Sequence, residues 1–160
     1  MNMEIRSWPY FVIEILSVIL LVCCFIPLMN PAGMAGGTVP THFDVSGAPD
    51  GSGDTGDLVW LALMGLFIYI VMSLGERFPK LINVPVRLND TGKEYLNENG
   101  WKLMRVTKLC CLFLMAYISW WTYWIAVGKA ETMPMWGVWL PICLMLGALA
   151  VFLYKLYNWN

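Results

Sequence analysis

Four long apolar runs constrain this chain more than any other feature of its sequence. They lie at about residues 10–28, 58–74, 105–127 and 135–155. Each run has about the 17–25 residues that a helix needs to cross the hydrocarbon core of a bilayer. Because that core cannot solvate unpaired backbone groups, each run is predicted to form a helix. The predicted fold class is therefore all-α, as a polytopic membrane protein with four transmembrane helices.

The amino-acid composition is typical of an integral membrane protein. Of the 160 residues, 59% are hydrophobic and only 13% are charged, whereas soluble domains have about 25% charged residues. The length allows one domain, so residues 1–160 are predicted to form a single integral membrane domain. The net charge is −1, which gives no overall field to attract nucleic acid. The expected partner is the lipid bilayer.

Lysine and arginine predict the orientation in the membrane. The outer loop, residues 29–57, has neither. The segment 75–104, predicted as a basic cytoplasmic loop, carries Arg77, Lys80, Arg87, Lys93 and Lys102. The positive-inside rule then places both termini and the basic loop in the cytoplasm, and the outer loop on the extracytoplasmic side.

One stretch of the basic loop has the pattern of a helix start. Thr91-Gly92-Lys93-Glu94 resembles a capping box. It predicts an amphipathic cytoplasmic helix before the third transmembrane helix. Asn99-Gly100 predicts an interruption of that helix.

The sequence offers little that is typical of an enzyme. It shows no nucleophile–base pair, no glycine-rich phosphate loop and no second histidine. The five cysteines fall in apolar runs without Cys-x-x-Cys spacing, which indicates packing residues. A non-enzymatic role is therefore favoured.

The outer loop is the segment most suited to carry a function. At about 29 residues it is longer than a connector needs, and loops of that length are often functional. It is rich in glycine and proline, its charges are all acidic, and it holds the only histidine, His42. The leading prediction is that this loop binds an extracytoplasmic ligand. The predicted ligand-binding residues are His42, Phe43, Asp44, Gly47, Pro49 and Asp50.

Two metal sites are alternative interpretations of the same loop. His42, Asp44 and Asp50 could coordinate a divalent transition metal, which would fit a metal-dependent membrane enzyme. The segment Asp50-Gly-Ser-Gly-Asp54 has the alternating oxygen spacing that begins a calcium loop. However, Thr55 stands where such a loop has its invariant glycine.

A structured turn is the third interpretation. In it, Asp50 acts as a cap or forms an Asx-turn, and Gly47 and Gly51 supply positive φ angles. His42 then hydrogen-bonds within the loop. The sequence alone leaves the three interpretations open.

Glu14 is an ionisable residue inside the first apolar run. Such residues are functional candidates by default. Arg105 and Lys108 lie at a matching depth in the third run, so Glu14 and Arg105 are predicted as an intramembrane charge site. The alternatives are a structural ion pair, snorkelling to the interface, or a small transporter or transporter subunit that depends on Glu14.

The outer loop also resembles a known signature. The segments Val39-Pro40-Thr41-His42-Phe43-Asp44 and Gly47-Ala48-Pro49-Asp50 resemble a bacterial family of membrane domains of unknown function, numbered sixteen-forty-eight. The family has asparagine where this chain has Asp44, and a lysine often follows its Pro-Asp. Asn83-Val84-Pro85-Val86 resembles a second family segment. The resemblance covers about residues 26–86.

The resemblance implies a function that the residues themselves do not show. The same domain forms the N-terminal part of Sdp-type immunity proteins, which are multi-pass proteins of the bacterial cytoplasmic membrane. They protect a cell from a secreted peptide toxin. The resemblance therefore implies an extracytoplasmic peptide ligand and a role in immunity or signalling, with Asn83 and Pro85 shaping the cytoplasmic face.

A further expected partner is a second copy of this chain, in a homo-oligomer. However, no small-xxx-small stripe in the helices favours one arrangement of the copies.

Overall fold

The structure, a computed structural model, describes residues 8–30, 37–78 and 88–159. It contains four long helices: α1 (Trp8–Phe25), α2 (Asp57–Arg77), α3 (Asp90–Ala126) and α4 (Trp136–Trp159). A short 3-10 helix, η1 (Ile26–Met29), extends α1. All four long helices are apolar enough and long enough to cross a membrane. The predicted all-α, multi-pass fold is confirmed.

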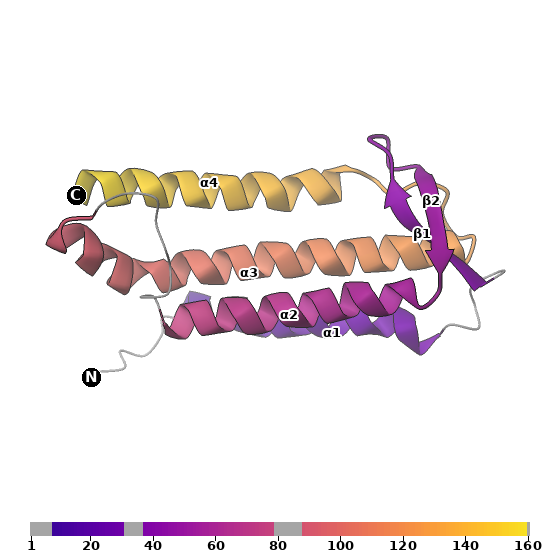
Figure 1. Ribbon diagram of the computed structural model, residues 1–160, viewed down its shortest axis with the longest axis horizontal. Coiled ribbons are helices and arrows are strands. Elements are labelled where there is room, and N and C mark those ends of the chain that lie inside the picture. Colours follow the sequence, from indigo (N-terminus) through magenta and orange to yellow (C-terminus); the bar gives the residue numbers. More distant parts are fainter. Residues whose placement is uncertain (1–7, 31–36, 79–87, 160) are drawn as a thin grey trace.

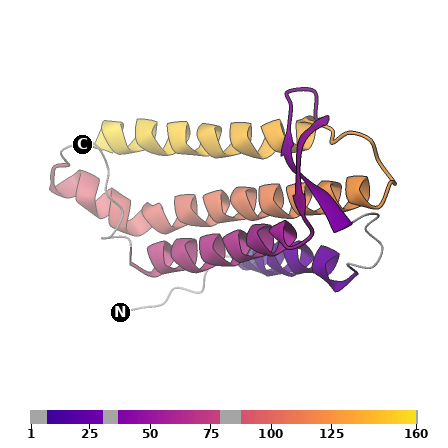
Figure 2. The same ribbon diagram turned by 45° about the vertical axis from the view of Figure 1, so that its right-hand side comes forward.

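The four helices run side by side in alternating directions (Figure 1). The start of α1 and the end of α4 lie at one end, which we call the basic end because Arg77, Lys102 and Lys155 lie there. The opposite end is called the hairpin end. Helix α3 packs against all three other helices, whereas α4 packs against α3 without a comparable contact to α1 or α2 (Figure 2).

Helix α3 is longer than the predicted third span. Its 37 residues extend roughly 55 Å, beyond the ~30 Å of the hydrocarbon core. The helix begins earlier than the Thr91 pattern predicts, because the Asn89 side chain accepts a hydrogen bond from the Gly92 N–H across 2.7 Å. The predicted interruption at Asn99-Gly100 is wrong. The Asn99 amide donates to the Tyr95 carbonyl oxygen (3.1 Å), and the helix continues.

The predicted cytoplasmic helix and the third transmembrane helix are thus one element. Figure 1 shows the first turns of α3 inclined to the rest of the helix at the basic end. Burial explains the continuity, because Gly100 is buried and Leu96 packs with Phe152 and Leu156 of α4. Packing of these turns against α4 outweighs the weak helix preference of asparagine and glycine.

The outer loop contains a β-hairpin that the sequence pattern did not predict. Strands β1 (Thr38–Phe43) and β2 (Pro49–Asp54) pair antiparallel. Val39 of β1 is buried against Leu58 of α2, and Tyr123 of α3 packs on the same cluster. The hairpin therefore lies across the ends of α2 and α3 at the hairpin end (Figures 1 and 2).

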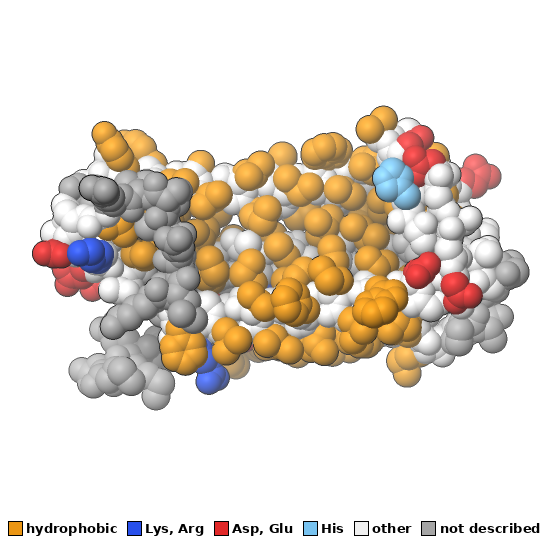
Figure 3. Space-filling view, viewed as in Figure 1, with side chains coloured by type: hydrophobic (Ala, Val, Ile, Leu, Met, Phe, Trp, Pro, Cys, Tyr) orange, Lys and Arg blue, Asp and Glu red, His pale blue; other side chains and the backbone are white. Residues whose placement is uncertain are grey.

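Small residues form the contact between the helices near that end. Cys24, Ala62 and Ala116 are buried together, one each from α1, α2 and α3. Small side chains let membrane helices approach closely. Many large apolar side chains instead face outward, and they cover the helices between the two polar ends (Figure 3). This surface contacts the lipid bilayer.

Candidate functional site

The tip of the hairpin is organised by Asp44. Its Oδ1 atom accepts hydrogen bonds from the Ser46 hydroxyl (2.6 Å), the Ser46 N–H (2.8 Å) and the Ala48 N–H (2.9 Å). These bonds, the Ser46 hydroxyl first, hold the pKa of Asp44 below its usual range. The Asx-turn is therefore formed by Asp44. The prediction that Asp50 forms it is wrong, because Asp50 lies in strand β2.

Two structural constraints favour glycine at position 47. Its φ angle is +85°, a conformation that other residues adopt at a cost. A Cβ atom at this position would also overlap the carbonyl oxygen of Met133. The positive φ predicted for Gly47 is confirmed. The same prediction for Gly51 is wrong, since Gly51 is not among the described residues with positive φ.

A β-bulge shapes the strand that carries His42. Pro40 pairs with Ser52, but the next pair joins His42 and Gly51, so Thr41 is the extra residue of β1. Proline has no N–H to donate, so it is tolerated beside a bulge. Because the bulge breaks the alternation of side chains, Thr41 and His42 are both exposed.

Two glycines of β2 make room for these side chains. A Cβ atom on Gly51 would lie 3.2 Å from the His42 Cβ, and one on Gly53 would lie 2.6 Å from a Thr41 methyl carbon. Both distances are shorter than ordinary van der Waals contacts. The glycines of the Asp50–Asp54 segment therefore have a packing role in the hairpin.

His42 contacts Asp50 across the hairpin. The Nδ1–H of the ring donates to Oδ1 of the carboxylate, so the hydrogen bond predicted for His42 within the loop is confirmed. The two side chains are 73% and 46% exposed. The pair is thus held in place by the hairpin and is accessible to a ligand.

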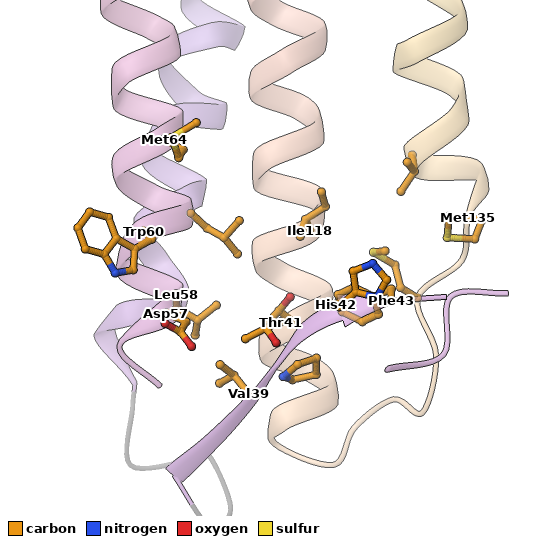
Figure 4. Close-up of a pocket in the computed structure, with 15 residues that line it drawn as sticks. Val39, Thr41, His42, Phe43, Asp57, Leu58, Trp60, Met64, Ile118 and Met135 are labelled. Atoms are coloured by element: carbon orange, nitrogen blue, oxygen red, sulfur yellow. The ribbon is translucent and has the colours of Figure 1, made fainter. Parts of the chain in front are cut away.

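A groove of about 630 Å³ lies beneath β1, and we call it the hairpin groove. Its walls come from β1, α2, α3 and the start of α4, and most lining side chains are apolar (Figure 4). His42 and Phe43 lie toward Met135, the residue just before α4, whereas Asp57 and Trp60 belong to α2. The arrangement suits a ligand with an apolar body and a polar part near the hairpin.

The six predicted ligand-binding residues separate into three pairs. His42 and Phe43 line the hairpin groove. Asp44 and Gly47 build the turn, while Pro49 and Asp50 begin β2, with Pro49 paired to Phe43. The predicted cytoplasmic motif of Asn83 and Pro85 lies outside the described residues.

The predicted metal ligands do not converge on one point. Within residues 8–30, 37–78 and 88–159, no group of three or more His, Cys, Asp or Glu side chains could hold a metal ion. Oδ1 of Asp44 is engaged in the turn, and Asp50 contacts His42. The Asp50–Asp54 segment is an extended strand, which differs from the curved backbone that surrounds calcium in an EF-hand.

A second polar site lies inside the helices, near the basic end. Glu14 of α1, Glu76 of α2, and Arg105 and Lys108 of α3 form a cluster of two negative and two positive charges, here called the ion cluster. The Arg105 and Lys108 side chains are 1% and 0% exposed. Lys108 Nζ lies 2.7 Å from Glu14 Oε2 and 2.5 Å from Glu76 Oε1. Buried charges are stable only when paired in this way.

The structure brings Glu14 together with Arg105, as the sequence suggested, at 3.7 Å between Arg105 Nε and Glu14 Oε2. The stronger partner of Arg105 is Glu76, at 2.5 Å from Nη2. Sequence reasoning missed Glu76 because the predicted second helix ended at residue 74. A signal existed, since Tyr69, Ser73 and Glu76 recur at intervals of four and three residues, which is one face of a helix.

A cavity of about 360 Å³ opens beside the ion cluster. The Tyr69 hydroxyl donates to Glu14 Oε1 (2.9 Å), and Lys108 donates to the Ser73 hydroxyl (3.2 Å). Glu14 and Ser73 both line the cavity. The cluster is therefore a hydrogen-bonded polar site with access to a space that can hold small polar molecules.

Comparison with models of protein families, with curated proteins and with solved structures finds no match. The resemblance of residues 39–50 to an immunity-related family stays an expectation from the motif. The function is inferred from the geometry of the hairpin groove and of the ion cluster.

Proposed function

We propose that this protein is a non-enzymatic membrane protein that binds a cationic, amphipathic peptide at the hairpin groove. The observation that carries the proposal is the groove itself, which has a volume of about 630 Å³, mostly apolar walls and an exposed His42 that is held by Asp50. Ligand sites are typically apolar concavities with a few fixed polar groups. The hairpin provides both.

The charge of the hairpin end supports a cationic ligand. Among the described residues at this end, Lys129 is the one lysine or arginine, whereas five are acidic: Asp44, Asp50, Asp54, Asp57 and Glu131. Complementary charge steers a ligand toward its site and adds specificity. An apolar face on the peptide would fill the groove while its basic residues meet the aspartates.

The proposal includes an orientation. The basic end faces the cytoplasm, and the hairpin end faces the extracytoplasmic side of a bacterial cytoplasmic membrane. The positive-inside rule supports this orientation, because the basic residues concentrate at the end opposite the hairpin. A secreted peptide toxin would reach the groove from that side. This access agrees with the role in immunity or signalling that the family resemblance implies.

Direct binding tests the proposal. The protein would be placed in nanodiscs of zwitterionic lipid and titrated with a synthetic amphipathic peptide of leucine and lysine. Met64→Trp fills the groove and is expected to weaken binding roughly tenfold. Leu63→Trp is the matched control, because Leu63 is the neighbouring exposed residue of α2 and does not line the groove. Equal binding by both variants would contradict the proposal.

A cell assay tests the immunity role separately. Cells that express the protein would be challenged with a secreted peptide toxin, and His42→Ala is expected to lose protection at unchanged expression. Full protection by His42→Ala would argue against immunity through this loop, whereas the binding titration would still test the groove.

A second candidate function, a small transporter or a transporter subunit, is favoured by the ion cluster and its cavity. Ionisable groups in transmembrane helices often form proton or substrate paths. The test is proton flux into proteoliposomes that contain a pH-sensitive dye, under an imposed potential. This function predicts that Glu14→Gln abolishes the flux and that His42→Ala keeps it. Absence of flux in the unaltered protein would contradict it.

A further inference from the structure

Apart from the hairpin groove and the cavity beside the ion cluster, another groove lies at the basic end, between α3 and α4. It has a volume of about 440 Å³. We call it the lysine groove, because Lys102 of α3 and Lys155 of α4 line it. Among the described residues that form its walls there is no carboxylate. It is therefore distinct in charge from the ion cluster, where two carboxylates balance two cations.

The two lysines are available to an outside anion. In the described part of the chain, neither Lys102 nor Lys155 has a carboxylate within ion-pair distance. Lys102 is nevertheless positioned, since its amine donates to Asn99 Oδ1 across 2.7 Å. Two uncompensated lysines that line one groove, one of them held by Asn99, form a site that favours an anionic group.

The wall behind the lysines is well packed. The rings of Tyr95 and Phe152 lie 5.7 Å apart. Phe152 is also buried with Leu96 and Leu156, which joins the end of α4 to the start of α3. The groove is thus a formed feature of the contact between α3 and α4.

The groove leads from the charged mouth toward the apolar middle of the helices. Lys155, Val151 and Gly147 lie four residues apart on α4 and all line it, so they share one face over roughly 12 Å. A Cβ atom on Gly147 would meet nothing within 4 Å. This open strip beside Val151 has the shape and polarity that an acyl chain needs.

We propose that the lysine groove binds an anionic phospholipid. The phosphate lies between Lys102 and Lys155, and one acyl chain follows α4 past Gly147. Basic pockets between transmembrane helices are suited to anionic headgroups, because the lysines act together with the apolar wall. The lipid would also fill the space beside α4, whose main helix contact is with α3.

Native mass spectrometry of delipidated protein in detergent tests this site. The probes are dioleoyl phosphatidylglycerol and dioleoyl phosphatidylcholine, which differ only in the headgroup. The unaltered protein is expected to prefer phosphatidylglycerol. Each lysine near a headgroup accounts for about a fivefold change in affinity. Lys102→Gln with Lys155→Gln should therefore remove the preference, whereas Lys93→Gln, an exposed lysine outside the groove, should keep it.

Gly147→Leu tests the acyl-chain part of the site. A Cβ atom at this position meets nothing within 4 Å, so the leucine side chain is expected to occupy the open strip. Both lipids should then bind more weakly while thermal unfolding stays unchanged. Equal affinity of the unaltered protein for the two lipids would overturn the proposal. So would a preference that survives the double lysine variant. Competition by millimolar inorganic phosphate that removes lipid binding entirely would point to a free-phosphate site and overturn the lipid assignment.

Discussion

The backbone N–H of Met133 donates to the carbonyl oxygen of Gly47 across 2.8 Å. This bond joins the turn of the hairpin to the segment between α3 and α4. Met133 is buried and lines the hairpin groove. The position of the hairpin over the groove therefore depends on a backbone contact that only a residue without a side chain permits.

Gly47→Ala is expected to loosen the hairpin. The variant places a Cβ against the Met133 carbonyl and holds alanine at positive φ, which together cost about 1–3 kcal/mol. The measurement is hydrogen exchange at the Met133 amide and limited proteolysis of the hairpin. Gly128→Ala is the control, because Gly128 also has positive φ but open space around its Cβ. Equal effects of the two variants would show that the contact with Met133 does not matter.

Lys108→Met is expected to destabilise the helices strongly. It leaves Glu14 and Glu76 with one cation between them, and breaking a buried ion pair costs about 3–5 kcal/mol. The double variant Lys108→Met with Glu76→Gln should recover part of the loss, since it restores the balance of charge. The measurement is a double-mutant cycle on the free energy of unfolding. Lys129→Met, on an exposed turn, should change it by less than about 0.5 kcal/mol.

The hairpin turn is expected to loosen in acid. Because the folded turn lowers the pKa of Asp44, its ionised form stabilises the turn. That contribution is complete above the unfolded value of about 3.9 and is lost as the pH falls through the lower folded pKa. Hydrogen exchange at the Ala48 amide measures it. Asp44→Ala should expose this amide at every pH, and an unchanged Ala48 exchange rate in that variant would contradict the role of the carboxylate.

Purified protein is expected to hold no stoichiometric transition metal at the outer loop. Catalytic zinc sites have three protein ligands. Here His42 and Asp50 could supply two metal ligands, while the Asp44 Oδ1 atom already accepts three hydrogen bonds. The measurement is elemental analysis of the unaltered protein beside His42→Ala. Near-stoichiometric zinc that disappears in the variant would contradict the expectation and favour a metal-dependent enzyme.

The transmembrane helices could be predicted because each one appears in the sequence as a long, nearly uninterrupted apolar run. The predicted spans agree with α1, α2 and α4 to within a few residues at each end. The start of α3 was harder to predict, because Asn99 and Gly100 favour a break locally. Packing of Leu96 on α4 decides the outcome, and that contact joins residues far apart in the chain.

The hairpin could not be predicted from strand propensity. Pro40, Gly51 and Gly53 are residues that strands usually disfavour. The strands form because a bulge accommodates Pro40, because the glycines leave room for Thr41 and His42, and because Val39 is buried on the helices. The motif residues could be named from the sequence, but their division between turn and groove depends on three-dimensional contacts.

The contact between Glu14 and Lys108 joins residues that are 94 positions apart. At roughly 5–20 residues per second, a ribosome needs about 5–20 s to make that stretch. During biogenesis the first helix therefore carries an unmatched carboxylate until the third helix is made, and such a group is costly in lipid. The hydrogen bond from Tyr69 to Glu14 therefore becomes possible with the second transmembrane helix, whereas the balancing charge of Lys108 arrives only with the third.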